Sequence, residues 1–120
     1  MIESEVGGFE DLLVWKESMG LTISIYEQLK LCKDYGLKDQ MQRAAVSVPS
    51  NIAEGFERQT NKEFVQFLYI SKGSCAELRT QLYIAIKLNY ILQKEGMELI
   101  KKAEGISKML FKLIAYRKKL

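Results

Sequence analysis

The sequence predicts an all-α protein, folded as an antiparallel up-down-up-down four-helix bundle, in a single domain that spans residues 1–120. The chain contains only one proline and eight glycines, a composition more typical of helical proteins than of β-sandwiches. In four segments, apolar residues recur at intervals of three and four, as they do along one face of a helix. Short turn signals separate these segments, which is typical of helices that pack antiparallel to their neighbours.

The first predicted helix covers residues 11–33 and carries two apolar rows. The first row contains Leu12, Trp15, Met19, Thr22, Tyr26 and Leu29, and the second contains Val14, Leu21 and Ile25. Asp34-Tyr35-Gly36 ends the pattern, and Gly36 is expected to form a left-handed cap at the end of the helix.

The second predicted helix covers residues 37–58 and contains Pro49. At 100° per residue, the apolar residues on both sides of the proline fall within about 80° of one another. They are Met41, Ala45, Val48, Ile52 and Phe56, and the opposite side carries Arg43, Ser47, Ser50, Asn51, Glu54 and Arg58. This shared phase predicts one helix, kinked at Pro49, although an interior proline costs about 3 kcal/mol. A break at Val48 is the alternative, because residues before proline avoid helical angles, and Asn51 and Glu54 would then cap a new helix.

The third predicted helix covers residues 61–93, and Thr60 with Glu63 forms a capping box at its start. One face contains Phe64, Phe67, Leu68, Cys75, Leu78, Leu82, Ala85 and Leu92. Tyr83, Ile86 and Tyr90 form a second apolar row, and a helix that is apolar on two sides must bury both. This surplus indicates self-association, with a broad core face as the alternative.

The fourth predicted helix covers residues 96–118, after a turn at Lys94-Glu95-Gly96. One face carries Leu99, Ala103, Ile106, Leu110, Leu113 and Arg117. Lysines occupy much of the remaining surface of this helix.

The charge is unevenly distributed along the chain, which has a formal net charge of +3. Residues 1–35 contain three lysines and seven acidic residues, whereas residues 94–120 contain eight basic and three acidic residues. Such asymmetry predicts a nucleic-acid or acidic partner, unless antiparallel helices neutralise each other. The candidate nucleic-acid-binding residues are Lys101, Lys108, Lys112, Arg117, Lys118 and Lys119, together with Arg79 and Lys87.

Catalytic and metal-binding patterns are missing from the sequence. It contains no histidine, and the two cysteines, Cys32 and Cys75, have no metal-binding spacing, so we expect no enzyme activity, metal or cofactor. The polar residues around Pro49 would form either a polar site or, as we favour, a hydrogen-bonded seam between helices. No apolar run is long enough to span a membrane, and the Met1–Gly8 segment is acidic where a signal peptide is basic, which predicts a cytoplasmic location.

A longer pattern runs through these segments. It comprises Phe9-x-x-Leu12-x-x-Trp15, then Tyr35-Gly36-Leu37-x-x-Gln40-x-x-Arg43-Ala44-Ala45-x-Ser47-x-Pro49-Ser50-Asn51-Ile52-Ala53-Glu54-Gly55, then Lys62-Glu63-Phe64, Gly73-Ser74 and Glu77-Leu78-x-Thr80. The pattern resembles the bacterial four-helix-bundle proteins encoded within intervening sequences of 23S ribosomal RNA genes. The motif residues are Trp15, Arg43, Ser47, Pro49, Asn51, Glu54, Gly55, Gly73 and Glu77. Cys75-Ala76 and Arg79 depart from the Leu and Glu that are more usual there.

The resemblance implies a four-helix bundle that assembles as a homopentamer. A related branch, the accessory variability proteins of diversity-generating retroelements, binds a reverse transcriptase and nucleic acid. The resemblance attaches no enzyme activity to the motif. We therefore expect a non-enzymatic oligomer that binds RNA or DNA through its basic residues. The alternative is a protein–protein adaptor without nucleic-acid binding, which would use its apolar surface or the acidic Glu10, Asp11 and Glu17.

Overall fold

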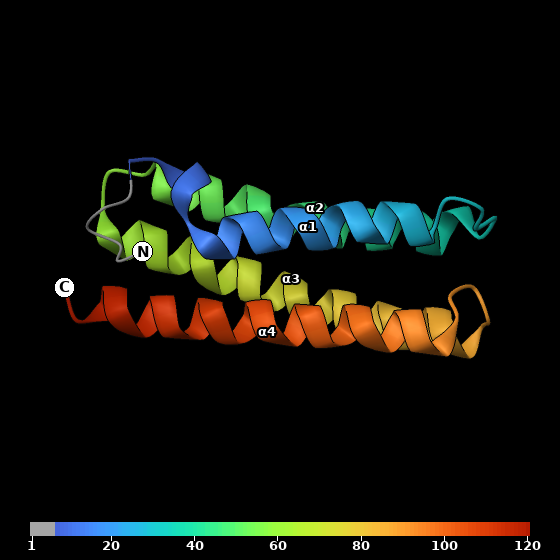
Figure 1. The fold of residues 1–120 in the computed structure, drawn as a ribbon. Helices are drawn as coiled ribbons and strands as arrows, with labels where there is room; N and C mark the ends of the chain where they lie inside the picture. Colours follow the sequence, from blue (N-terminus) through green and yellow to red (C-terminus); the bar gives the residue numbers. More distant parts are fainter. Residues whose placement is uncertain (1–6) are drawn as a thin grey trace.

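The computed structural model describes residues 7–120, which form four α-helices and no strand, so the predicted all-α class is confirmed. The helices are α1 (Leu13–Gln28), α2 (Tyr35–Phe56), α3 (Asn61–Lys87) and α4 (Gln93–Lys118), and a short 3₁₀ helix at Phe9–Asp11 precedes them. All four run along the long axis of a molecule that measures 45 × 23 × 20 Å (Figure 1). Residues 1–6, which hold most of the acidic Met1–Gly8 segment, lie outside the described residues.

Neighbouring helices run in opposite directions. The connections from α1 to α2 and from α3 to α4 lie at one end of the bundle, and the connection from α2 to α3 lies at the other end (Figure 1). The side chain of Asn61, at the start of α3, hydrogen-bonds to the backbone oxygen of Arg117 near the end of α4. At the other end, Gly96 in the first turn of α4 packs against Ile86 in the last turn of α3.

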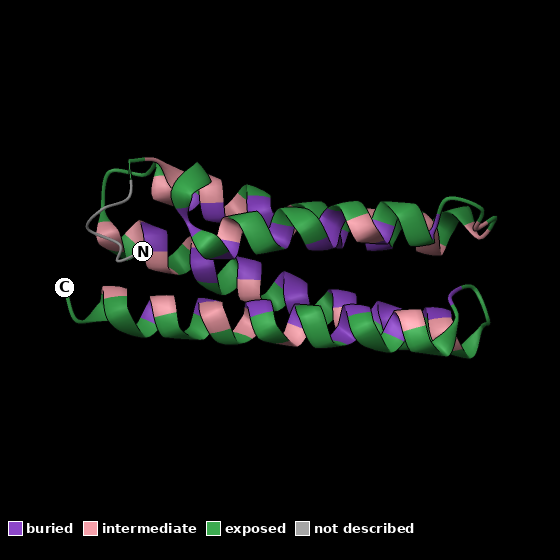
Figure 2. Cartoon of the chain, in the orientation of Figure 1, coloured by how far each residue is buried: buried purple, intermediate pink, exposed green. Residues whose placement is uncertain are grey.

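One hydrophobic core lies between the four helices, on the sides that face one another (Figure 2). Both rows predicted for the first helix contribute buried residues. The second row is buried at Val14, Leu21 and Ile25, and the first row is buried at Leu12, Thr22 and Leu29. Met19 and Tyr26, also from the first row, are exposed. The rows are adjacent on the helix, and the buried side of α1 covers the second row and the adjoining edge of the first.

The first connection differs from the prediction, because α1 ends at Gln28 and α2 begins at Tyr35. The carboxylate of Asp34 accepts a hydrogen bond from the backbone N–H of Leu37 at 3.1 Å and thereby caps α2. Gly36 consequently lies in the first turn of α2, and no glycine of residues 7–120 has a positive φ. The prediction of a left-handed cap at Gly36 was therefore wrong.

The connection between α3 and α4 also lies earlier than predicted, because α3 ends at Lys87 instead of residue 93. Asn89 adopts a left-handed conformation, with a φ of 62°. The backbone N–H groups of Asn89 and Tyr90 donate to the carbonyls of Ile86 and Ala85, respectively, which is the Schellman pattern of helix termination. Leu92, predicted on the core face of this helix, is exposed in the connection.

Gly96 was expected in this turn but lies buried within α4. A Cβ atom on this residue would lie 2.5 Å from two side-chain carbons of Ile86. The glycine therefore allows α3 and α4 to approach closely, rather than permitting a turn.

Helix α2 continues without interruption through Pro49, so the alternative of a break at Val48 is excluded. The proline has no N–H group to donate to the carbonyl of Ala45. The hydroxyl of Thr22 in α1 lies 3.0 Å from that carbonyl oxygen and 2.8 Å from the carbonyl oxygen of Ser18. The group that reaches the carbonyl of Ala45 therefore belongs to a neighbouring helix. The kink at Pro49 stays a prediction.

Candidate nucleic-acid interface

The polar residues around Pro49 form a hydrogen-bonded seam between α2 and α3. The amide nitrogen of Asn51 donates to both the hydroxyl and the backbone oxygen of Ser47, each at 2.8 Å. The Ser47 hydroxyl is 2.8 Å from that of Ser74, which in turn donates to the carbonyl of Ile70. These groups already have partners within the protein, which favours a role in helix packing over a role as a polar site.

Gly55 brings α2 and α3 together next to this seam. A Cβ atom at residue 55 would lie 2.5 Å from the Cβ atom of Phe67 and 3.3 Å from the carbonyl oxygen of Phe64. Gly73 differs, because it is exposed and a Cβ atom there would meet nothing within 4 Å. The bundle itself therefore requires a glycine at residue 55 but not at residue 73.

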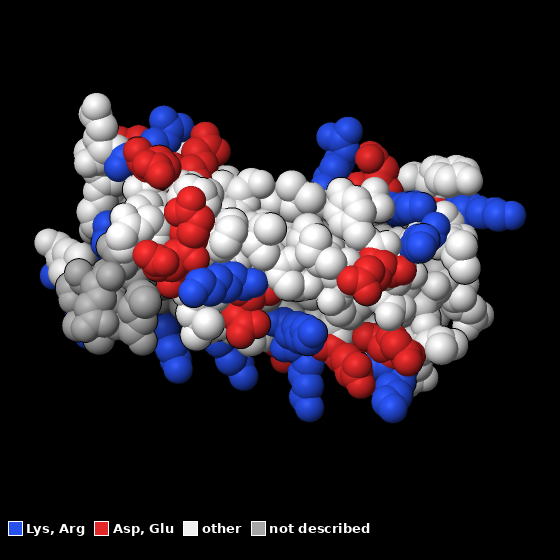
Figure 3. Space-filling model, turned by 45° about the horizontal axis from the view of Figure 1, so that its top comes forward, with Lys and Arg blue, Asp and Glu red and all other residues white. Residues whose placement is uncertain are grey.

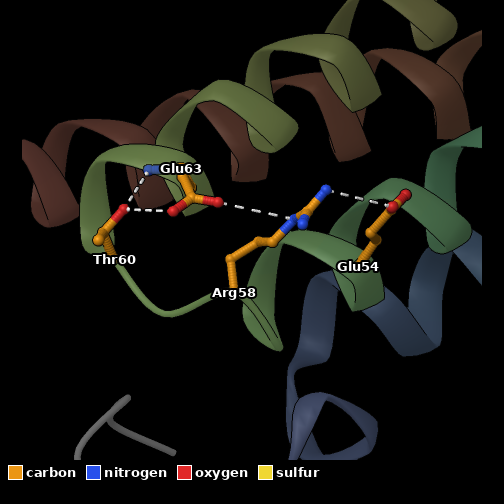
Figure 4. Close-up of polar contacts among 4 residues, drawn as sticks. All are labelled: Glu54, Arg58, Thr60 and Glu63. Atoms are coloured by element: carbon orange, nitrogen blue, oxygen red, sulfur yellow. Dashed lines mark hydrogen bonds and ion pairs between the residues drawn. The ribbon is translucent and has the colours of Figure 1, made fainter.

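A chain of charged side chains follows the seam toward the start of α3 (Figure 4). Arg58 lies 3.7 Å from Glu54 and 3.8 Å from Glu63, and its guanidinium group stacks on the ring of Phe67. The hydroxyl of Thr60 accepts from the backbone N–H of Glu63 and donates to its carboxylate, each at 3.1 Å. The predicted capping by Thr60 is confirmed, but the carboxylate of Glu63 contacts the threonine hydroxyl and Arg58 rather than a backbone N–H.

The other motif residues have separate environments. Arg43 pairs with Asp39 at 2.9 Å on the exposed side of α2. Trp15 is half-buried and packs edge-on against Phe9, with ring centroids 5.4 Å apart. Glu77 is exposed on α3. No single site gathers these residues.

The structure does bring together the lysines of α4. Lys101, Lys108, Lys112 and Lys119 lie within about 40° of one another on the helix, opposite its buried residues, and Lys94 continues the row. All five are exposed. They are called the basic face below. Basic side chains project along the lower edge of the view in Figure 3, on the side where α4 lies in Figure 1.

The acidic residues of α1 do not neutralise the basic face. Among residues 7–120, the ion pairs involve Arg43 of α2 and Arg58 of the connection between α2 and α3, and none of these lysines. The positive charge of α4 is therefore available to solvent. Lys94 was predicted in a turn but lies in the first turn of α4 and belongs to this face as well.

Arg117 was predicted to contact nucleic acid but points toward the core of the bundle. Its Nε donates to the side-chain oxygen of Asn61 at 2.6 Å, and its guanidinium group lies 4.8 Å from the centroid of the Phe64 ring. This half-buried residue joins α4 to the start of α3. We therefore count it as a structural residue rather than as part of the basic face.

The other predicted residues lie outside the basic face. The ammonium group of Lys118 donates to the hydroxyl of Tyr69 in α3 at 3.2 Å. Arg79 is half-buried in α3, and Lys87 is exposed at the end of that helix. Arg79 and Lys72 flank Cys75, whose pKa is raised to about 11 because burial outweighs their positive charges.

Three residues that were not predicted as site residues, Lys72, Ser107 and Phe111, line a groove between α3 and α4. The groove has a volume of about 270 Å³, and its lining residues are Lys72, Ser107, Lys108, Phe111 and Lys112. Phe111 lies between Lys108 and Lys112 in the sequence, and its side chain is 63% exposed. An aromatic residue outside the apolar periodicity of α4 was the signal for this groove, but the contribution of Lys72 depends on how α3 packs against α4.

A second, smaller groove between α1 and α4 has the opposite charge. It includes Glu27 of α1 with Glu95 and Glu98 of α4, and its volume is about 140 Å³. In the part of the chain that the structure describes, no group of three or more acidic or cysteine residues has the arrangement of a metal site. Within the same residues, no helix has both the length and the apolar character needed to cross a membrane.

Comparison with known proteins places this arrangement in a family. No curated protein matches the chain. Among solved structures, the chain is similar to a protein of unknown function from the S23 ribosomal protein family of Bacteroides thetaiotaomicron VPI-5482. The two share 24% sequence identity and superpose with a TM-score of 0.80 over 85% of this chain and 98% of the other, which shows a common fold. The model of the 23S rRNA-intervening sequence protein family matches residues 10–112, and the chain therefore belongs to that family.

Proposed function

We propose that the protein binds RNA or DNA through the basic face of α4. The observation that carries the proposal is the row of five exposed lysines along one side of a single helix, none of which pairs with a carboxylate of residues 7–120. Such a row binds nucleic acid with little dependence on base sequence, because the lysines contact the phosphate backbone of the nucleic acid and release its condensed counterions.

The proposal includes self-association into a homo-oligomer, for which the family resemblance suggests a pentamer. Its support is the outer surface of α3, where Ile70 is 52% and Ile84 43% exposed. The exposed Gly73 lies between them and leaves room for a neighbouring helix to approach. Apolar side chains on an outer helix face are a common mark of a contact surface. In a ring, the basic faces of several copies would act on one nucleic acid together.

The proposed activity is binding without catalysis, in the cytoplasm. The interactions of the motif's serine and carboxylate support the absence of catalysis in this proposal. The Ser47 hydroxyl is hydrogen-bonded to Asn51 and Ser74, and Glu54 forms an ion pair with Arg58 at the surface. The chain has no histidine that could activate the serine. The proposal includes a nucleic-acid enzyme, such as a reverse transcriptase, as a protein partner.

A protein–protein adaptor is the second candidate. The exposed acidic residues Glu10, Asp11 and Glu17 at the start of the described chain favour it. An adaptor would retain its protein partner after nuclease treatment. Charge reversal in α1, rather than in α4, would release that partner.

The test is charge reversal at the centre of the basic face. In the variant with Lys108→Glu and Lys112→Glu, we expect affinity for RNA and DNA to fall at least tenfold at low salt, measured by fluorescence anisotropy. The matched control is Lys16→Glu with Lys30→Glu, which makes the same charge change at exposed positions outside α4. Equal losses in the two variants would show that only net charge matters and would refute the assignment to α4.

A further inference from the structure

We infer that the groove between α3 and α4 stacks one unpaired base on Phe111, so that the protein selects single-stranded over double-stranded nucleic acid. This inference rests on the proposed function, since it gives the basic face a substrate class. Neither the family match nor the similar structure assigns a role to the groove or to Phe111.

The first argument is the exposure of Phe111. Its ring is 63% exposed at the surface of a helix whose buried side is already filled by Ile106, Leu110 and Ile114. The side chain is therefore not needed to fill the core. Base stacking on exposed aromatic rings is the usual means by which proteins hold single strands without sequence preference.

The second argument is the charge around the ring. Lys108 and Lys112 lie four residues apart on α4, and Lys72 of α3 completes the lining of the groove with Ser107. Three lysines and Phe111 thus line the same groove, and no acidic residue lines it. A nucleotide combines an apolar ring face with a flanking phosphate, and this lining complements both parts.

The third argument is the size of the groove. Its volume of about 270 Å³ is below the range of roughly 300–1,000 Å³ that is typical of sites for larger small molecules. One base has room there. In a duplex the faces of the bases are stacked on each other, so a ring at the protein surface could reach only the phosphates.

The strand can continue from the groove toward the end of α4. Lys118 lies seven residues after Phe111, and therefore on the same side of the helix, where its ammonium group contacts Tyr69. In the other direction, Arg79 lies seven residues after Lys72 on α3. Basic residues thus flank the groove on both sides along the bundle axis.

The experiment compares Phe111→Ala with the wild-type protein in fluorescence anisotropy at about 50 mM salt. The probes are an unstructured single strand of about 24 nucleotides and a blunt-ended duplex of about 12 base pairs, which carry similar numbers of phosphates. We expect the wild-type protein to prefer the single strand. Phe111→Ala should weaken single-strand binding roughly 5- to 100-fold, leave duplex binding nearly unchanged, and lose the preference. Phe111→Tyr should retain it.

The control variant is Tyr116→Ala, which removes another exposed aromatic ring of α4 that does not line the groove and should not change the preference. Circular dichroism confirms that each variant is folded. If Phe111→Ala binds both probes like the wild type, while Lys108→Glu with Lys112→Glu binds neither, the stacking site is refuted and the proposed function stands. If the wild-type protein binds neither probe, both are refuted.

Discussion

Pro49 is tolerated because a residue of another helix replaces its missing hydrogen bond. The freed carbonyl of Ala45 lies 3.0 Å from the hydroxyl of Thr22. A second link from α3 lies one turn away, where the hydroxyl of Ser71 donates to the carbonyl of Val48 at 2.8 Å. The proline thus couples α2 to α1 through Thr22, since a buried carbonyl without a partner would be costly.

Thr22→Val should reveal this coupling, because the substitution keeps the shape of the side chain and removes its hydroxyl. We expect a loss of about 1–3 kcal/mol in the free energy of unfolding, measured by urea denaturation. In the Pro49→Ala background the loss should be smaller, because the alanine N–H can then bond to the carbonyl of Ala45. An equal loss in both backgrounds would contradict this role for Thr22.

The two cysteines should differ sharply in reactivity. Cys75 is buried, and burial raises its pKa to about 11, whereas Cys32 is only half-buried. At pH 8, roughly one thousandth of Cys75 would be thiolate even if the reagent could reach it. Mass spectrometry after iodoacetamide treatment should find Cys32 modified in the native protein and Cys75 modified only after denaturation. Rapid modification of Cys75 in the folded protein would contradict its burial.

At the scale of the helices, the sequence predicted which helices form more accurately than it predicted where each helix begins and ends. The four apolar periodicities predicted all four helices, and Thr60 marked the start of α3 correctly. The ends of α1 and α3 were placed too late, because apolar residues continue into the connections as Leu31 and Leu92, which are exposed. Asp34 and Asn89 set the adjoining helix ends through capping geometry that the apolar pattern does not register.

The glycines of α2 and α1 provide a test of helix packing. Gly55→Ala should destabilise the protein by about 1–3 kcal/mol, because the new Cβ atom would clash with Phe67. Gly20→Ala is the matched control in α1, where nothing lies within 4 Å, and should stabilise the protein by up to about 1 kcal/mol. Both values can be measured by urea denaturation. If Gly55→Ala were as stable as Gly20→Ala, close packing of α2 and α3 would be ruled out at that point.

The candidate site was only partly predictable from the sequence, because some of its residues come together only when two helices pack against each other. Lys101, Lys108, Lys112 and Lys119 share a face of α4 by their spacing alone, so the pattern was sufficient. Arg117 falls by its spacing on the apolar face of the same helix, away from these lysines. Its partners Asn61 and Phe64 could not be predicted, because they lie more than fifty residues earlier in the chain. Lys72 likewise reaches the groove only through the packing of α3 on α4. Contacts between helices cannot be read from the period of one helix.

At the scale of the whole molecule, the proposed oligomer makes a prediction about mass. Light scattering should give a particle several times heavier than the 13.8 kDa chain, and five times heavier if the pentamer is correct. Ile84→Glu, on the outer surface of α3, should dissociate it because a charge would be buried in the contact. Leu31→Glu is the control at an exposed residue in the connection between α1 and α2. A wild-type protein that stays monomeric at high concentration would contradict self-association.

The central claim is that the basic face of α4 binds nucleic acid through its phosphates, and the salt dependence of affinity tests it most directly. The dissociation constant of the wild-type protein for a single strand should be measured from about 50 to about 200 mM salt. The affinity should fall steeply, with a slope of log K against log salt of about −0.7 for each phosphate contacted. Tight binding that does not change with salt, or no binding at the lowest salt concentration, would contradict the claim.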